Sequence, residues 1–177
     1  MTRALTVVRA GLLTTVQDLG RWGHQASGVP VAGAMDTRAL RQANLLVGND
    51  EGAAALEITL LGPTLRATGA VTAALAGAAL DVDVDGRPAT VGRVFDVADG
   101  GVIRIGAGPA GAGARAYLAV RGGLETPVVL GSRATHLVAR LGGLGGRALM
   151  TGDVLPLGPA RGRPTTPGHG DAGGRTG

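Results

Sequence analysis

The chain has 177 residues, 45% of them hydrophobic, and a formal net charge of +4, which fits one folded domain with a core. It contains no lysine and no cysteine, which excludes a Walker A phosphate loop, a Schiff-base lysine, a biotin-carrying lysine and any thiol chemistry. Its 17 basic residues are scattered arginines, with one Trp, one Tyr and one Phe for stacking, so we expect no nucleic-acid partner.

The N-terminal stretch "MTRALTVVRAGLLTTV" predicts strands rather than an export signal or a membrane span. Arg9 interrupts its apolar run and polar residues follow, whereas a signal peptide or membrane helix needs a longer apolar segment. "ALTVVRA" and "LLTTVQDL" are typical of two short strands, with a turn at Gly11 between them. We therefore expect a cytoplasmic protein without a membrane partner.

A long polar loop, residues 19–35, precedes the one main helix that the pattern predicts. Loops of this length in compact domains are usually functional or disordered. Asp36 is suited to cap the N-terminus of a helix over residues 37–47, and Gly48 or Asn49 is suited to end it. The apolar residues at helical spacing are Ala39, Leu40, Ala43, Leu46 and Val47.

From residue 54 to residue 120, short strands follow one another between turn residues. Asp85-Gly86 is a strong signal for a hairpin turn. "GAGPAG", residues 106–111, matches the dinucleotide pattern G-x-G-x-x-G, but a strand rather than a helix follows it, so we interpret it as a hairpin connection. The pattern predicts a mostly β fold, an antiparallel barrel with one main helix.

Two patterns resemble metal sites but fail on spacing. Asp81, Asp83 and Asp85 begin like a calcium loop, yet Gly92 stands where that loop needs its glutamate. A solvated strand face explains these carboxylates better. The three histidines, His24, His136 and His169, are far apart and lack metal-ligand spacing. We therefore expect no metal site.

Composition divides the chain into two parts. Residues 160–177 contain no Val, Leu or Ile, so they cannot bury an apolar face. We expect a folded domain over residues 1–159 and a disordered, low-complexity tail over residues 160–177.

Five residues are candidates for a functional site. Asp18 and Arg21 stand at the start of the long loop, where a carboxylate beside a fixed guanidinium would orient and polarise an amide or carboxylate substrate. The alternative is an Asp18–Arg21 ion pair that only holds the loop on the barrel. Gln17 precedes them as a substrate-binding candidate, and Ser132 with Arg133 would form a small anion site after Gly131. The alternative for Ser132 is a turn whose hydroxyl satisfies local backbone.

Two further charged residues, Glu57 and Arg147, can each be interpreted in two ways. Glu57 alternates with apolar neighbours in a predicted strand, and Arg147 follows two glycines. Either residue is a buried charge that needs a partner, or an outward-facing one.

Six stretches, in this order, resemble one family. They are "GLLTTVQDLGRWGHQASGVPVAGAMD", "ANLLVGN", "ALEITLLGP", "RAYLAVRGG", "LGSRAT" and "GRALMTGD". Together they resemble the biotin-dependent carboxyltransferase family, also called allophanate hydrolase subunit 2, which includes the KipA-like C component of 5-oxoprolinase and a segment of urea carboxylase. The resemblance implies a cyclophilin-like β-barrel and covers the N-terminal half of the family's module.

The resemblance also implies an activity that needs other chains. The expected role is that of one component of an ATP-dependent amide-processing enzyme, with a KipI-like subunit 1 protein (the B component) and an A component as partners. The reaction would be opening of 5-oxoproline to glutamate, or carboxyl transfer from biotin to urea. ATP, and biotin where it is used, would come through the partner chains, and no cofactor would be covalently bound to this chain.

The sequence departs from the family in ways that keep an alternative open. The stretches "PGPQ" and "SDRMG" of the family's second half are absent, and His24 and His136 replace the usual Tyr and Asp. The alternative is a truncated, non-catalytic module that binds a partner.

Overall fold

The computed structural model describes residues 3–160, in which strands form two antiparallel sheets. The six-stranded sheet has the order β11 (Val154–Pro156), β1 (Ala4–Arg9), β4 (Thr64–Thr68), β9 (Val102–Ile105), β6 (Val82–Val84), β7 (Arg87–Ala89). The five-stranded sheet has the order β2 (Leu13–Gln17), β3 (Ala55–Thr59), β10 (Arg115–Val120), β5 (Val71–Gly77), β8 (Val94–Val97). A helix, α1 (Thr37–Val47), and a short 3₁₀ turn, η1 (Gln25–Ser27), lie between β2 and β3.

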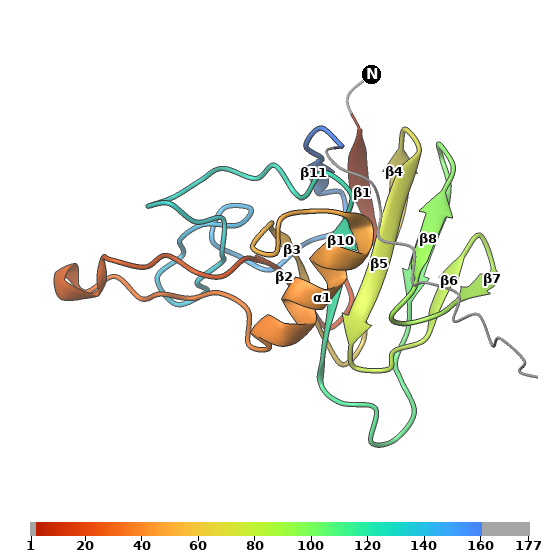
Figure 1. Ribbon diagram of the computed structural model, residues 1–177, viewed down its shortest axis with the longest axis horizontal. Helices are drawn as coiled ribbons and strands as arrows, with labels where there is room; N and C mark the ends of the chain where they lie inside the picture. Colours follow the sequence, from red (N-terminus) through yellow and green to blue (C-terminus); the bar gives the residue numbers. More distant parts are fainter. Residues whose placement is uncertain (1–2, 161–177) are drawn as a thin grey trace, which may run out of the picture.

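The two sheets enclose an aliphatic core, and α1 covers the outer face of the five-stranded sheet (Figure 1). Leu56, Leu75 and Leu118 of that sheet point into the core between the sheets. The alternate positions carry small residues that face α1, which lets the helix approach the sheet closely. These residues are Ala55, Ala74, Ala76 and Ala119.

The prediction of a mostly β, antiparallel fold with one main helix is confirmed. The described ladders form two sheets with free ends rather than one ring, so closure into a barrel stays a prediction. The "GAGPAG" stretch was predicted to connect a hairpin, and this is wrong. It joins β9 to β10, which lie in different sheets, so it carries the chain from one layer to the other.

The predicted ends of α1 are confirmed. The Asp36 carboxylate accepts hydrogen bonds from the backbone N–H groups of Arg38 and Ala39, at 3.1 and 3.0 Å. A cap of this kind contributes about 1 kcal/mol. Gly48 ends the helix in the left-handed conformation, with φ of 75°, where a residue without Cβ is favoured.

The hairpin predicted at Asp85-Gly86 is also confirmed, because β6 pairs with β7 across these two residues. Both have positive φ, 51° and 78°, as a type I′ turn requires. The carboxylates of Asp83 and Asp85 accept hydrogen bonds from the N–H groups of Gly86 and Val102. Across residues 3–160, no three acidic or histidine side chains are grouped closely enough to hold a metal ion.

Two segments with little regular structure project from one side of the sheets (Figure 1). One is the loop over residues 19–35, with η1 at its tip, and the other is the segment over residues 125–150. No helix within residues 3–160 is long and apolar enough to span a membrane. The tail predicted over residues 160–177 lies outside the described residues, apart from Ala160.

Candidate functional site

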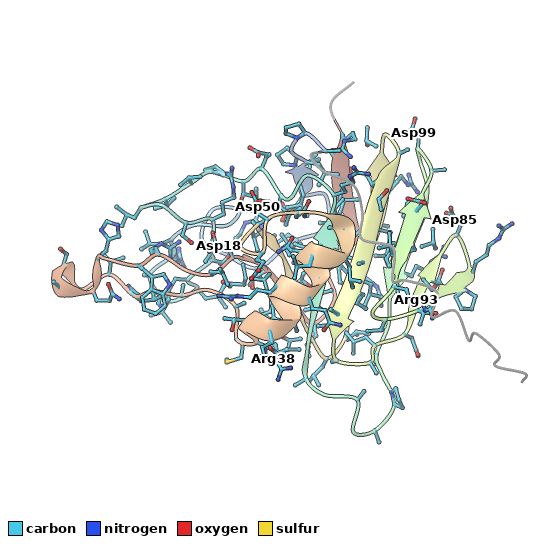
Figure 2. The ribbon with its side chains drawn as sticks, viewed as in Figure 1. Asp18, Arg38, Asp50, Asp85, Arg93 and Asp99 are labelled. Atoms are coloured by element: carbon cyan, nitrogen blue, oxygen red, sulfur yellow. The ribbon has the colours of Figure 1, made fainter. Side chains whose placement is uncertain are left out.

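The Asp18 carboxylate joins the two projecting segments at their base. Asp18 follows β2 at the start of the long loop (Figure 2) and is nine-tenths buried. Its Oδ1 accepts hydrogen bonds from the Ser132 hydroxyl at 2.6 Å and from the Gly20 N–H at 2.8 Å. Its Oδ2 accepts one from the Arg133 N–H at 2.6 Å. Two neighbouring candidates, Ser132 and Arg133, therefore bind the carboxylate of a third that lies more than a hundred residues earlier in the sequence.

The Ser132 hydroxyl has two functions in this arrangement. It donates to Asp18 and accepts a hydrogen bond from the N–H of Ala134 at 2.9 Å. The second contact is the local backbone bond expected of a turn serine, and the first is a long-range contact. The local contact fits the turn interpretation, whereas the anion-site interpretation stays a prediction, because the anion that Ser132 contacts here is Asp18 of the chain itself.

Arg21 is fully buried and binds carbonyl groups rather than a carboxylate. Its Nη2 donates to the Ala134 carbonyl, and its Nε donates to the Val129 carbonyl at 3.3 Å. Among the described residues it forms no ion pair with Asp18, and its Nη1 has no hydrogen-bond partner. The ion pair proposed as the structural alternative is therefore not formed. Asp18 and Arg21 instead hold the same segment, residues 129–134, by different groups.

Gln17 extends this buried cluster by one residue. Its Nε2 donates to the Thr15 hydroxyl and to the Thr135 carbonyl, at 3.1 and 3.0 Å, while its buried Oε1 lacks a partner. Buried polar atoms are normally hydrogen-bonded. The free acceptor of Gln17 and the free donor of Arg21 lie on side chains that bind the consecutive carbonyls of Thr135 and Ala134.

The Arg133 side chain differs from the other four because it reaches an open cleft. Its Nη1 donates to the Thr126 carbonyl, and its Nη2 lies 3.2 Å from the Glu125 carboxylate. The structure thus brings all five predicted residues to one region, with Gln17, Asp18, Arg21 and Ser132 buried and Arg133 facing the cleft.

A second buried network, around Tyr117, anchors the far end of the long loop. The Tyr117 hydroxyl donates to the Glu57 carboxylate at 2.7 Å and accepts from the N–H of Asp36 at 2.8 Å. Glu57 also accepts from the Met35 N–H at 2.8 Å and lies 3.5 Å from Arg115. Burial, followed by the nearby Glu57, raises the pKa of Tyr117 far above its ordinary value. Glu57 is therefore a charge with partners, and Tyr117 was missed because a lone tyrosine in an apolar strand resembles a core residue.

Arg147 also has a partner. Its Nη1 and Nη2 donate to the two oxygens of Asp153, at 2.7 and 2.8 Å, in the forked geometry typical of arginine and carboxylate. The hydrogen bond from Arg147 holds the pKa of Asp153 below its usual range. This pair fixes the turn after residue 147 to the start of β11.

The Asp153 pair predicts an acid-sensitive contribution to stability. Because the pKa of Asp153 is lowered by folding, its contribution is present above the unfolded pKa of about 4 and is lost as the pH falls through the folded value. Urea unfolding of the wild type and of Asp153→Asn, from about pH 6 to about pH 2, would show a difference that shrinks toward acid. A difference that stays constant across this range would contradict the assignment.

One family model and several known proteins match this chain. The family model described as "Carboxyltransferase domain, subdomain A and B" matches residues 27–172. The chain is 44% identical over 157 residues to the C component of 5-oxoprolinase from Escherichia coli (strain K12), covering 89% of this chain and 50% of that protein. It is 40% identical over 155 residues to urea amidolyase of Lachancea kluyveri, covering 87% of this chain and 8% of that protein.

A solved structure shares the fold. The crystal structure of the K. lactis urea amidolyase matches with a TM-score of 0.86 and 35% sequence identity, over 93% of this chain and 10% of that chain. The chain thus spans about half the length of the bacterial relative and a small part of the fungal proteins.

Proposed function

Because the chain belongs to the family of the carboxyltransferase domain, subdomain A and B, we propose that it is a component of an ATP-dependent amide-processing enzyme. The family predicted from the six ordered stretches is thereby confirmed. The relatives include one component of a 5-oxoprolinase, and urea amidolyases. We propose the first activity for this chain, opening of 5-oxoproline to glutamate, with carboxyl transfer to urea as the alternative substrate class.

The observation that carries the proposal is the meeting of two loop segments at Asp18. Ser132 and Arg133 lie 114 and 115 positions from Asp18, yet both donate hydrogen bonds to its carboxylate. A loop anchored only for stability would need fewer buried charged groups, since each is costly to remove from water. The arrangement gathers a carboxylate, a guanidinium and an amide side chain in one buried region, and these groups could recognise a planar amide once the 129–134 segment is displaced.

The roles that we propose follow the chemistry of each group. Asp18 and Arg21 would orient and polarise the amide, and Gln17, Ser132 and Arg133 would bind the rest of the substrate. In the described structure, the 129–134 segment occupies Asp18 and Arg21. Substrate contact with these two groups therefore requires that segment to be displaced in the assembled enzyme.

The proposal places ATP, and biotin where it is used, on partner chains. The chain has no lysine, so it offers neither a phosphate-loop lysine nor a biotin attachment site. The proposed partners are a KipI-like B component and an A component of 5-oxoprolinase. This chain would contribute one wall of a shared site.

The test is reconstitution with defined partners. The full chain is co-expressed with the A and B components of the Escherichia coli enzyme, with and without the second half of its C component, and glutamate formation from 5-oxoproline is measured. We expect ATP-dependent glutamate release that requires this chain. A parallel assay supplies urea, bicarbonate and a biotinylated carrier protein, and consumption of urea alone there would show that the 5-oxoproline proposal is wrong. No turnover of either substrate, while the intact C component from Escherichia coli is active in parallel, contradicts the enzymatic proposal.

A second candidate function is a partner-binding module without catalysis. The exposed apolar side chains of the two projecting segments favour it, because such surfaces commonly mark interfaces. These residues are Trp22, Val128, Leu130, Leu137 and Val138. Size-exclusion chromatography would show co-elution with the B component without turnover if this function holds. A monodisperse monomer that ignores the B component contradicts it.

A further inference from the structure

A polar cleft of about 510 Å³ opens beside the C-terminal end of α1. One part of its lining, residues 48–50, follows the helix directly, and the other part includes Gly122, Glu125 and Arg133. A volume of this size is typical of small-molecule sites. The cleft is separate from the buried cluster around Arg21, but it shares Arg133 with the site described above.

The Arg133 guanidinium is the cation of the cleft, and a ligand can replace its partner, the Glu125 carboxylate. The ion pair with Glu125 is accessible to solvent, with 24% and 48% of the two side chains exposed. Solvent-exposed ion pairs contribute little to stability. A ligand carboxylate can therefore replace Glu125 on the guanidinium, while the bond from Nη1 to the Thr126 carbonyl keeps the group oriented.

The end of α1 offers the opposite charge. The Asp50 carboxylate has neither a hydrogen bond nor an ion pair with any described residue, and it lies just past the helix end (Figure 2). The carboxyl end of a helix carries partial negative charge. This side of the cleft therefore favours an ammonium group.

We propose that this cleft binds the zwitterionic head group of a small α-amino acid. The carboxylate of the ligand would lie on Arg133, and its ammonium group would lie near Asp50 and the end of α1. An anion alone would meet two carboxylates, Asp50 and Glu125, against one guanidinium, so a ligand that carries both charges fits better. The identity of the amino acid rests on the proposed function, in which the released product is glutamate.

The cleft is linked to the buried cluster through one residue. The N–H of Arg133 donates to Asp18, while its side chain lines the cleft. A ligand carboxylate on Arg133 would therefore contact the 129–134 segment that covers Arg21. Product bound in the cleft would stabilise the closed arrangement of that segment.

The experiment is a titration of the full chain with L-glutamate, without partners or ATP, followed by the amide NMR signals. We expect saturable shifts at Asn49, Asp50, Gly122 and Gly123. N-acetyl-L-glutamate lacks the ammonium group and L-glutamate α-methyl ester lacks the α-carboxylate. Each should bind about tenfold more weakly or worse, as expected for loss of a charged hydrogen bond.

Variants locate the two contacts. Arg133→Gln and Asp50→Asn should each weaken L-glutamate binding by about tenfold. Glu51→Gln is the matched control, because Glu51 neighbours Asp50 but pairs with Arg41 at 3.3 Å and does not line the cleft. Arg140→Gln controls for loss of an exposed arginine on the same segment. Both controls should bind as the wild type does.

Three results would overturn the proposal. They are no saturable binding to the wild type, equal binding of the N-acetylated probe, and unchanged binding by Asp50→Asn. If circular dichroism shows that Arg133→Gln does not fold, Arg133→Lys replaces it, because lysine keeps the charge but lacks the forked donors. L-glutamate binding by Arg133→Lys should then be weaker than binding by the wild type, and this result is read together with that of Asp50→Asn. Because the titration uses neither partners nor ATP, its failure is distinct from a failure to release glutamate in the reconstituted enzyme.

Discussion

Replacing Asp18 by alanine should lower the free energy of unfolding by about 3 to 5 kcal/mol. The carboxylate accepts three hydrogen bonds, two of them at 2.6 Å, and hydrogen bonds to a charged group contribute about 1.5 to 3 kcal/mol each. Without it, the Ser132 hydroxyl and the N–H of Arg133 lose their partner beneath the loops. Urea unfolding of the full chain measures the loss, and activity of the reconstituted enzyme should be lost as well.

Asp99 gives a matched comparison for this prediction. It accepts one hydrogen bond, from the N–H of Gly69 at 2.7 Å, at an exposed turn, so Asp99→Ala should cost about 1 kcal/mol or less. The loss of unfolding free energy in Asp18→Asn should lie between those of Asp18→Ala and Asp99→Ala, because an amide oxygen replaces only part of the carboxylate's acceptor capacity. If Asp18→Ala costs no more than Asp99→Ala, the carboxylate does not hold the segments together.

Local chemistry was enough to predict the helix, its ends and many of the strands, but not β11, which lies beyond the strand-rich stretch over residues 54–120. Asp36 caps α1 and Asp85-Gly86 turns a hairpin because each depends on neighbouring backbone alone. The partition into two sheets depends on distant contacts. β1 and β2 follow each other across Gly11 but join different sheets, and a Cβ at Gly11 would lie 2.6 Å from the Leu61 carbonyl oxygen. Glycine here permits a close backbone crossing, and not only the turn that the sequence indicates.

The contacts of the candidate site were likewise predictable only where the residues are close in sequence. Gln17, Asp18 and Arg21 are close in sequence, so their proximity was predictable, whereas the contact of Asp18 with Ser132 and Arg133 spans more than a hundred residues. The ordered motifs include both segments that are in contact, but they do not show which atoms bond to each other. The Asp18–Arg21 pair looked natural from spacing alone, yet Arg21 turns to the carbonyls of the 129–134 segment. Side-chain direction in a long loop is set by the segment packed on it.

Arg21→Met should leave stability nearly unchanged while lowering the activity of the reconstituted enzyme about a hundredfold or more. Arg21 is a fully buried cation without a carboxylate partner among the described residues, and its Nη1 is unpaired. Burial of such a charge is costly, and an apolar residue of similar volume is often as stable. The lost bonds to Val129 and Ala134 oppose this gain, so we expect a change within about 1.5 kcal/mol.

Measuring both the unfolding free energy and the activity separates a functional role of Arg21 from a structural one. Arg21→Lys keeps the charge but loses the forked donors, so it should recover little activity. Arg115→Met is the comparison for removing a partly buried arginine outside the cluster, since Arg115 lies 3.5 Å from Glu57. It should leave activity close to that of the wild type. If Arg21→Met unfolds the chain by several kcal/mol, or if the folded variant retains full activity, Arg21 serves only to hold the 129–134 segment in place.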